Sequence, residues 1–392
     1  MSNNVKLHHK PLLVVLLAVL LTLPGWGAGR VSAETSSPAC GTGDHGLLTE
    51  LQNGQAEAGA SPLVFSDIQF LNDHTGRAAG NGFLIGTSDG GCNFQKIYQG
   101  QWSFKQIDFP DNVRGWALAS VQDGIPEYLI KTTDGGTHWK RVSSGAVSFE
   151  TIDFMDGMSG FGYNRGSTYR TVDGGAHWSK VPTPANTRGA YFSSIKEGWA
   201  VVIAPGAGYR LMKTINGGTT WSLSLKAAFD DPEYGQIYAK GNQVWAVLYG
   251  GSGMSQTSYS LYASSNKGSS WERVIAQDTA GGGPAPGSAA AQVTFGPANG
   301  KPGNMQLVGS GSAYLVGFSP AAEKVAVGRS LNGGRVWSNL PSIRGFEGRI
   351  SFTSDKVGWL ALRKLGSSEI YTTTDGGSTW KLKLSLAAPE NP

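Results

Sequence analysis

Short runs of alternating apolar and polar residues follow one another along most of this chain. Apolar and polar side chains alternate in residues 104–109, as in a half-buried β-strand, and a turn-like stretch at 110–115 leads to a second apolar run. Two further runs, 128–132 and 139–142, are separated by a glycine-rich turn. The pattern predicts four short strands that together form one structural unit.

The glycine-rich turn recurs along the chain, and its second copy reads Thr-Asp-Gly-Gly-Thr-His-Trp from Thr133. Each of the seven copies has an aspartate or asparagine at one position, namely Asp89, Asp134, Asp173, Asn216, Asn266, Asn332 and Asp375. These residues follow one another at intervals of 39 to 50 residues, with a single interval of 66. That is the period of a four-stranded propeller blade. The sequence therefore predicts an all-β fold, a seven-bladed β-propeller of four-stranded antiparallel blades, across residues 61–386.

The variation within the turn indicates a structural role. A short side chain with an acceptor oxygen can bond the backbone N–H groups of the turn, and glycine tolerates the positive φ that follows. Asparagine replaces aspartate in three copies, so the acceptor is required and the negative charge is not. We expect these residues to stabilise hairpins rather than to hold calcium or perform catalysis.

The first and sixth expected units have the following runs, and the sixth is the loosest. The first has runs at 68–70, 76–80 and 83–86, and the sixth has looser runs at 293–295, 305–309 and 325–328. Residues 277–304, rich in Gly, Ala and Pro, account for the long interval as a flexible insertion. Since the last unit carries its own fourth strand, we expect the ring to close by packing of the last blade on the first. Residues 387–392 form a tail.

The N-terminus resembles an export signal. Basic residues precede an apolar run from Pro11 to Leu23, and Val31-Ser32-Ala33 has the form of a signal-peptidase site. We expect residues 1–33 to be removed by cleavage after Ala33, leaving an exported chain. An uncleaved anchor and a lipoprotein attached through Cys40 are the alternatives, although the apolar run is shorter than the roughly 20 residues that span a bilayer. Residues 34–60 read as a flexible arm that could reinforce the closing seam.

The chain has two cysteines, Cys40 and Cys92. In an exported protein they suggest one disulfide, which would join the arm to the first blade. Two separate thiols are the alternative.

Composition and charge narrow the function classes. Glycine is abundant at 57 of 392 residues, and the 12 tryptophans imply many tight turns and much aromatic packing. The formal charge is +4, and removal of residues 1–33 leaves it near +1. That charge is too small to indicate nucleic acid as a partner.

Turns of the form Thr-x-Asp-Gly-Gly-x-x-Trp, each preceded by an Ile-x-Phe, turn, Gly-Trp segment, resemble the Asp-box (BNR) propellers. They are most similar to the photosystem II stability and assembly factors. The Gly-Trp half is clearest at residues 115–116, 198–199 and 358–359. The resemblance implies an exported, non-enzymatic scaffold that binds a protein partner, a membrane-protein subunit. We expect a monomer with no cofactor. It also implies an arginine-rich contact face. Arg77, Arg114 and Arg165 lie in or beside turns between first and second strands, so they are candidates for one shared rim; ordinary solvated arginines are the alternative.

Asp-box repeats also occur in sialidases and some endoglucanases, so a secreted glycan-binding or glycan-cleaving propeller is the second hypothesis. The Arg-Ile-Pro motif of sialidases is missing, and residues 349–351 are its nearest approach. Asp108 and Asp153 occupy equivalent positions in two first strands and could form a glycosidase pair, although their equivalence by repeat is the simpler explanation. His138 and His177 share a position in adjacent units and lack a third ligand for a metal. We therefore expect no catalytic residue and no metal site.

Overall fold

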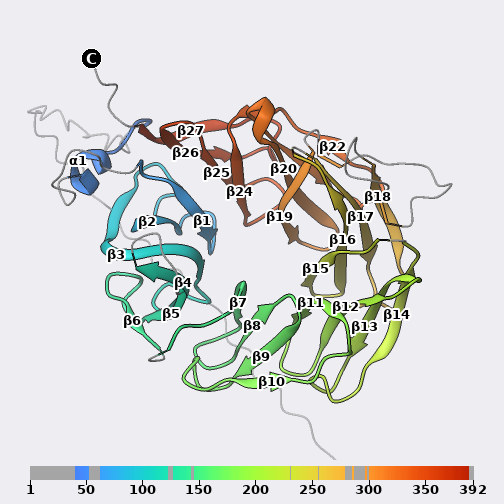
Figure 1. The fold of residues 1–392 in the computed structure, drawn as a ribbon. Helices are drawn as coiled ribbons and strands as arrows, with labels where there is room; N and C mark the ends of the chain where they lie inside the picture. The colour runs from blue at the N-terminus through green and yellow to red at the C-terminus, as the bar shows by residue number, and fades with distance from the viewer. Residues whose placement is uncertain are drawn as a thin grey trace, which may run out of the picture. The chain divides into compact units, whose positions relative to one another are not determined.

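The computed structural model describes residues 40–52, 62–121, 127–142, 145–229, 231–254, 256–278, 285–286, 296–297 and 300–387. The expected signal segment 1–33, most of the insertion 277–304 and the tail from 388 lie outside these ranges. Residues 40–392 group as one unit, in which antiparallel sheets follow one another around a ring (Figure 1). The chain is thus an all-β propeller, as predicted.

The described strands form six sheets. The first contains β1 (Phe65–Phe70), β2 (Gly76–Thr87), β3 (Gln95–Asp108), β4 (Gly115–Val121), β5 (Glu127–Thr132) and β6 (Lys140–Arg141). The second contains β7 (Thr151–Phe154), β8 (Gly160–Asn164), β9 (Ser167–Thr171) and β10 (Ser179–Val181). The third contains β11 (Thr187–Phe192), β12 (Gly198–Ala204), β13 (Gly208–Thr214) and β14 (Ser222–Ala227).

The other three sheets complete the ring. The fourth contains β15 (Tyr234–Lys240), β16 (Gln243–Ser252), β17 (Thr257–Ser264) and β18 (Glu272–Gln277). The fifth contains β19 (Lys301–Val308), β20 (Ser312–Ser319), β21 (Lys324–Ser330), β22 (Ser338–Asn339) and β23 (Ile343–Arg344), with a 3-10 turn at Pro320–Ala322. The sixth contains β24 (Glu347–Phe352), β25 (Gly358–Arg363), β26 (Ser367–Thr373) and β27 (Lys381–Ala387).

The prediction of seven blades was wrong, because the first two expected units share one continuous strand. The first half of β3 pairs with β2, as in Phe83 with Gln99, and its second half pairs with β4, as in Asp108 with Trp116. The strand therefore ends the first repeat and begins the second. The two repeats merge into a single six-stranded sheet, and the ring has six sheets.

The fifth sheet also differs from the expectation for the sixth repeat. The run 293–295, expected as its first strand, lies outside the described residues. Instead β19, at Lys301–Val308, is the first strand of the sheet. The unpredicted β20, at Ser312–Ser319, pairs with it through a hairpin. The expected order of strands in this sheet was wrong. The Gly-Ser turn at 309–312 resembles the glycine-rich insertion before it, so the sequence did not mark it as a hairpin between two strands.

All seven glycine-rich turns have one hydrogen-bond design. In each, an aspartate or asparagine Oδ1 accepts the N–H of the residue four positions later at 2.9 Å. The same oxygen accepts a threonine or serine hydroxyl from two positions earlier. Positive φ follows at the next two residues, both glycine except in the fifth turn, where Lys267 takes the first place with φ 57°. The acceptor oxygen, which Asp and Asn share, is thus what the turn requires.

We expect Asp134→Ala to lower the free energy of unfolding by about 1 kcal/mol, because the N–H of His138 and the hydroxyl of Thr132 lose their acceptor. Asp134→Asn is the matched control and should stay within about 0.5 kcal/mol of the natural chain, since asparagine performs this role in three other turns. Urea unfolding at pH 7 measures both. An alanine variant as stable as the asparagine variant would contradict the prediction.

In several repeats the second strand starts with glycine, and the residue after this glycine joins neighbouring repeats. The Nε1 of Trp116 donates to the carbonyl of Gly174 in the next repeat at 2.9 Å. Its ring stacks on that of Phe154, with the ring centroids 3.9 Å apart. The Nε1 of Trp359 likewise donates to Gly90 at 3.0 Å. Burial of these rings and their indole hydrogen bonds stabilise the contacts between sheets.

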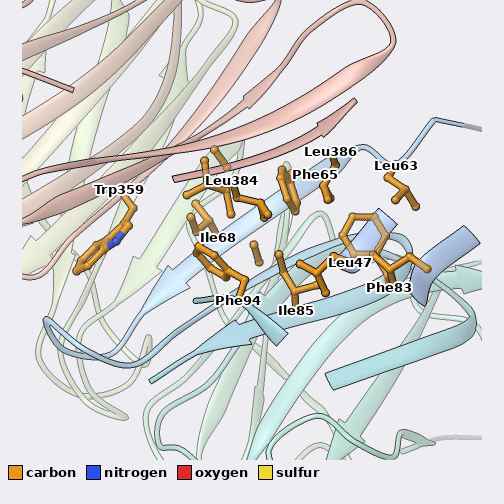
Figure 2. Packing of buried hydrophobic residues seen from close by; sticks show 14 of the residues in the cluster. Leu47, Leu63, Phe65, Ile68, Phe83, Ile85, Phe94, Trp359, Leu384 and Leu386 are labelled. Carbon is orange, nitrogen blue, oxygen red and sulfur yellow. The ribbon is translucent and has the colours of Figure 1, made fainter. Parts of the chain in front are cut away.

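The ring closes where the last sheet packs on the first (Figure 1). The ring of Trp359 stacks on that of Phe70 with centroids 3.5 Å apart, and the N–H groups of Phe65 and Phe70 donate to Ser368 and Ser351. Figure 2 shows the buried cluster behind this seam, to which β1, β2, β25–β27 and the N-terminal segment all contribute. No strand exchange is needed, in line with the closure expected from the sequence.

The segment 40–52 is not the flexible arm that the sequence suggested. A disulfide joins Cys40 to Cys92 with Cα atoms 4.5 Å apart, and helix α1 (Leu47–Gln52) follows. Leu47 and Leu51 are buried in the seam cluster, and the N–H of Ser385 in β27 donates to the carbonyl of Gly43. The segment is ordered because it is tied to both sides of the seam. No helix among the described residues is long and apolar enough to cross a bilayer.

Candidate functional site

The middle residue of each Ile-x-Phe segment lies on the inner edge of its sheet. In most repeats its polar side chain accepts an N–H from the first strand of the next repeat: Gln69 Oε1 from Phe109 at 2.8 Å, Asp108 Oδ2 from Phe154 at 2.5 Å, Gln306 Oε1 from Phe352 at 2.6 Å and Ser351 Oγ from Phe70 at 2.9 Å. These bonds satisfy the exposed edge of each inner strand.

Asp153 breaks this pattern. The N–H that it would accept, that of Phe192, donates instead to the phenol oxygen of Tyr163 at 3.1 Å. No described residue donates a hydrogen bond to the Asp153 carboxylate. Asp153 thus lies on an inner sheet edge without the backbone N–H partner that the equivalent side chains of other repeats have.

Asp108 and Asp153 interact electrostatically, so the structure does bring the two equivalent carboxyls together. Burial raises the pKa of Asp153 to about 6. Burial, and then the charge of Asp153, raises the pKa of Asp108 well above its usual range. Burial and the nearby carboxylates also raise the pKa of Tyr163 and Tyr191. Within the described part of the chain, no lysine or arginine forms an ion pair with either aspartate.

Asp153 lines a cavity of about 470 Å³, here called the inner cavity. Its walls include four tyrosines, Tyr163, Tyr191, Tyr234 and Tyr238. Arg165, Arg188 and Glu150 also line it. A second cavity of about 640 Å³ shares Thr151, Tyr234, Gln236 and Tyr238 with it and is lined on its other sides by the first and the last two sheets.

The charges of the inner cavity are arranged by strand position. Asp153 lies inside β7, opposite Phe161, whereas Arg165 lies in the turn just beyond the end of β8. Arg188 is the second residue of β11. Arg165 is 67% exposed and pairs with Glu150 at 3.8 Å. The cavity therefore has an acidic interior and a basic rim.

We expect Asp153→Asn to stabilise the chain at pH 7 but not at pH 4. Because the pKa of Asp153 in the folded chain, about 6, exceeds the value of 3.8 for a free side chain, folding favours its protonated form. Stability is therefore lost as pH rises from about 4 to 6, and each pKa unit is worth about 1.4 kcal/mol. The variant avoids this loss.

Urea unfolding at pH 4 and pH 7 measures the difference between the variant and the natural chain. The free energy of unfolding of the variant should exceed that of the natural chain by about 2 kcal/mol more at pH 7 than at pH 4. Equal differences at the two pH values would show that Asp153 ionises as an ordinary surface carboxyl.

Arg77 does not belong to an exposed contact face. It is only 6% exposed, its Nε donates to the carbonyl of Gly135 at 3.0 Å, and its guanidinium lies 4.2 Å from the ring centre of Phe109. It occupies the position that Trp116 and Trp359 hold in other repeats. Arg77 therefore joins two repeats, and its proposed role in a partner-binding rim was wrong.

Arg114 and Arg165 do not share one rim either. Arg114 precedes β4, in the turn between a first and a second strand, and pairs with Asp111 at 2.7 Å. Arg165 lies between the second and third strands β8 and β9. Successive turns of an antiparallel meander lie at opposite ends of its strands, so the two arginines lie on opposite faces. Only Arg165 lines the inner cavity.

The two histidines serve the glycine-rich turns. The Nδ1 of His138 lies 2.7 Å from Asp134 Oδ2, and that of His177 lies 2.7 Å from Asp173 Oδ2, with both rings largely exposed. Among the described residues, no group of three His, Cys, Asp or Glu side chains lies together as metal ligands do.

Several residues of the inner cavity were missed from the sequence. Tyr191 was within reach, because aligning the repeats places it at the same position as Asp108 and Asp153. Arg188, Tyr234 and Tyr163 carry no such signal. They meet only because three sheets converge there.

Comparison with known proteins identifies the fold. No protein-family model matches the chain, and no curated protein matches it. A solved structure of YCF48 bound to D1 peptide is similar, with a TM-score of 0.50, 20% identity, and coverage of 80% of this chain and 93% of that one. A prolyl endopeptidase has a TM-score of 0.51 at 11% identity, with coverage of 84% of this chain and 51% of that chain. YCF48 from Cyanidioschyzon merolae has a TM-score of 0.48 at 14% identity, covering 84% and 97%. At these identities the comparisons show a β-propeller and nothing finer.

Proposed function

We propose that this chain is an exported, monomeric propeller that binds a segment of a protein partner and catalyses no reaction, similar to the photosystem II assembly factors. The observation that carries the proposal is the likeness to YCF48 bound to D1 peptide. That likeness extends over 93% of the neighbour's length, so the propeller alone corresponds to nearly the whole of a protein that binds a peptide. The prolyl endopeptidase is matched over only 51% of its length.

The inner cavity and its rim are the best candidate for the contact face. The rim carries Arg165 and Arg188, and four tyrosine side chains line the cavity. Tyrosine and arginine are enriched where proteins bind other proteins. We therefore place the partner on the face that carries the β8–β9 turn, with a membrane-protein subunit as the candidate partner.

Affinity capture tests the proposal. The chain from residue 34, immobilised and exposed to detergent-solubilised membranes of its own host, should recover one membrane-protein subunit. Arg165→Glu combined with Arg188→Glu should reduce the recovery about tenfold, a loss of about 1.4 kcal/mol. Arg335→Glu is the matched control, because Arg335 is exposed in a glycine-rich turn on the opposite face, and it should bind as the natural chain does.

The second candidate is a glycan-binding or glycan-cleaving propeller, favoured by the paired carboxyls of Asp108 and Asp153. Glycosidases use a pair of carboxyl groups, and the pKa of the one that acts as general acid is raised. Against this, Asp108 already accepts the N–H of Phe154, so it has a structural task. A reducing-sugar assay on a panel of polysaccharides separates the two hypotheses. Sugar release that Asp153→Asn abolishes, with no subunit recovered by capture, would replace the first proposal by the second.

A further inference from the structure

We infer that the inner cavity is a subsite for one cationic side chain, a lysine ammonium or an arginine guanidinium, presented by the bound protein segment. This inference rests on the proposed function, which it deepens by naming the group that the cavity recognises.

The first argument is the unsatisfied carboxylate. Asp153 is half-buried and lines the cavity, and no described residue donates a hydrogen bond to it. Its equivalents Asp108 and Gln69 each accept a backbone N–H. A half-buried carboxylate without a protein donor depends on water in the cavity, which is less favourable than a paired carboxylate. A cation that enters the cavity provides both the donor and the opposite charge.

The second argument is the proximity of Asp108. Burial, and then the charge of Asp153, raises the pKa of Asp108, and no lysine or arginine of the described chain forms an ion pair with either group. Two enclosed carboxyls therefore keep a proton unless another cation replaces it. A guanidinium or ammonium from outside the chain can replace that proton.

The third argument is the aromatic wall. Tyr163, Tyr191, Tyr234 and Tyr238 line the cavity, and the faces of tyrosine rings attract cations. Tyr234 already makes such a cation–π contact at the rim, where the guanidinium of Arg165 lies 5.1 Å from the centre of the Tyr234 ring. The volume of about 470 Å³ falls within the range of about 300 to 1,000 Å³ typical of small-molecule sites.

The rim limits what can enter. Arg165 and Arg188 repel a segment that carries several adjacent positive charges, while Glu150, the ion-pair partner of Arg165, offsets part of that repulsion. The segment that fits best has one basic residue for the cavity and neutral or acidic neighbours for the rim. A strongly basic tail fits poorly.

Binding should depend on pH, since the cation competes with the proton held by the carboxyls. The groups that face the pair are Asp67, Tyr163 and Tyr191 from neighbouring strands, with Glu150, Arg165 and Arg188 at the rim. Burial raises the pKa of both tyrosines, so they stay neutral. The carboxyls of Asp67, Asp108 and Asp153, whose pKa values burial raises, therefore set the pH dependence of binding, and affinity should rise with pH.

The test uses methylguanidinium chloride as the probe and the purified chain from residue 34. Isothermal titration at constant ionic strength should show saturable millimolar binding that is at least fivefold stronger at pH 7.5 than at pH 5. Asp153→Asn should weaken binding at least tenfold. Asp67→Asn is the matched control, because burial also raises the pKa of Asp67, but this carboxyl accepts the N–H of Ile107 and lies outside the inner cavity. Since its charge acts on Asp108 only from a distance, the substitution should weaken binding far less than Asp153→Asn does.

The inference is overturned if the natural chain shows no saturable binding of the probe, or if Asp153→Asn binds the probe as well as the natural chain does. It is also overturned if Asp67→Asn weakens binding as much as Asp153→Asn does. Capture by the natural chain and by Asp153→Asn separates this inference from the proposed function. Equal recovery of the partner by both would overturn the subsite and leave the function standing. No recovery by the natural chain would overturn the function, while the titration still decides whether the cavity binds a cation.

Discussion

Replacing Trp359 by alanine should lower the free energy of unfolding by about 4 kcal/mol, the largest effect we expect from a single substitution. The side chain is 1% exposed, stacks on Phe70 at 3.5 Å and donates to the carbonyl of Gly90. Its loss leaves a cavity where the last sheet meets the first, and the partly buried carbonyl of Gly90 loses its donor. Urea unfolding at pH 7, followed by far-UV circular dichroism, measures the change.

Trp359→Phe is the matched control for this prediction. Phenylalanine keeps a ring to stack on Phe70 and loses the indole donor to Gly90, so we expect a loss of about 1 to 2 kcal/mol. If the alanine variant is no less stable than the phenylalanine variant, the seam does not depend on packing at this position.

Removing the disulfide should have the second largest effect. Cys40 and Cys92 are 52 residues apart, and a crosslink that closes a loop of this length restricts the unfolded chain. Loop entropy alone gives about 4 kcal/mol, and disulfides typically deliver somewhat less, so we expect about 3 kcal/mol. The combined variant Cys40→Ser and Cys92→Ser should lose that amount in urea unfolding. Its seam contacts, including Gly43 with Ser385 and Leu47 in the cluster, should weaken together.

A reducing agent supplies the control for the disulfide. Dithiothreitol should shift the unfolding midpoint of the natural chain to that of the serine variant and leave the variant unchanged. An identical midpoint for the natural chain with and without the reductant would show that the bridge adds no stability.

The glycine-rich turns were readable from the sequence because their chemistry is local. Asp134 bonds residues two positions before and four positions after it, so the residues that fix the turn lie within one short stretch. The exchange of Asp for Asn among the seven turns indicated that the oxygen matters and the charge does not. The same locality made the all-β propeller predictable from the repeat interval.

The role of Arg77 could not be read from its own surroundings in the sequence. An arginine beside a turn is usually a surface residue, and only the neighbouring repeat provides the carbonyls of Gly135 and Asn112 that hold its guanidinium. Its equivalence to Trp116 was visible in the repeat. The decisive contact is 58 residues away.

The sequence by itself determined the repeat, the hairpin chemistry and the all-β class, since each depends on residues close together in the chain. Tertiary structure alone decided the number of sheets, because β3 continues through the boundary between two repeats. It also decided the inner cavity. The side chains of Asp153, Arg188 and Tyr234 come from three sheets, and nothing in their local sequence specifies that these sheets converge, because the ring is closed by packing between units distant along the chain.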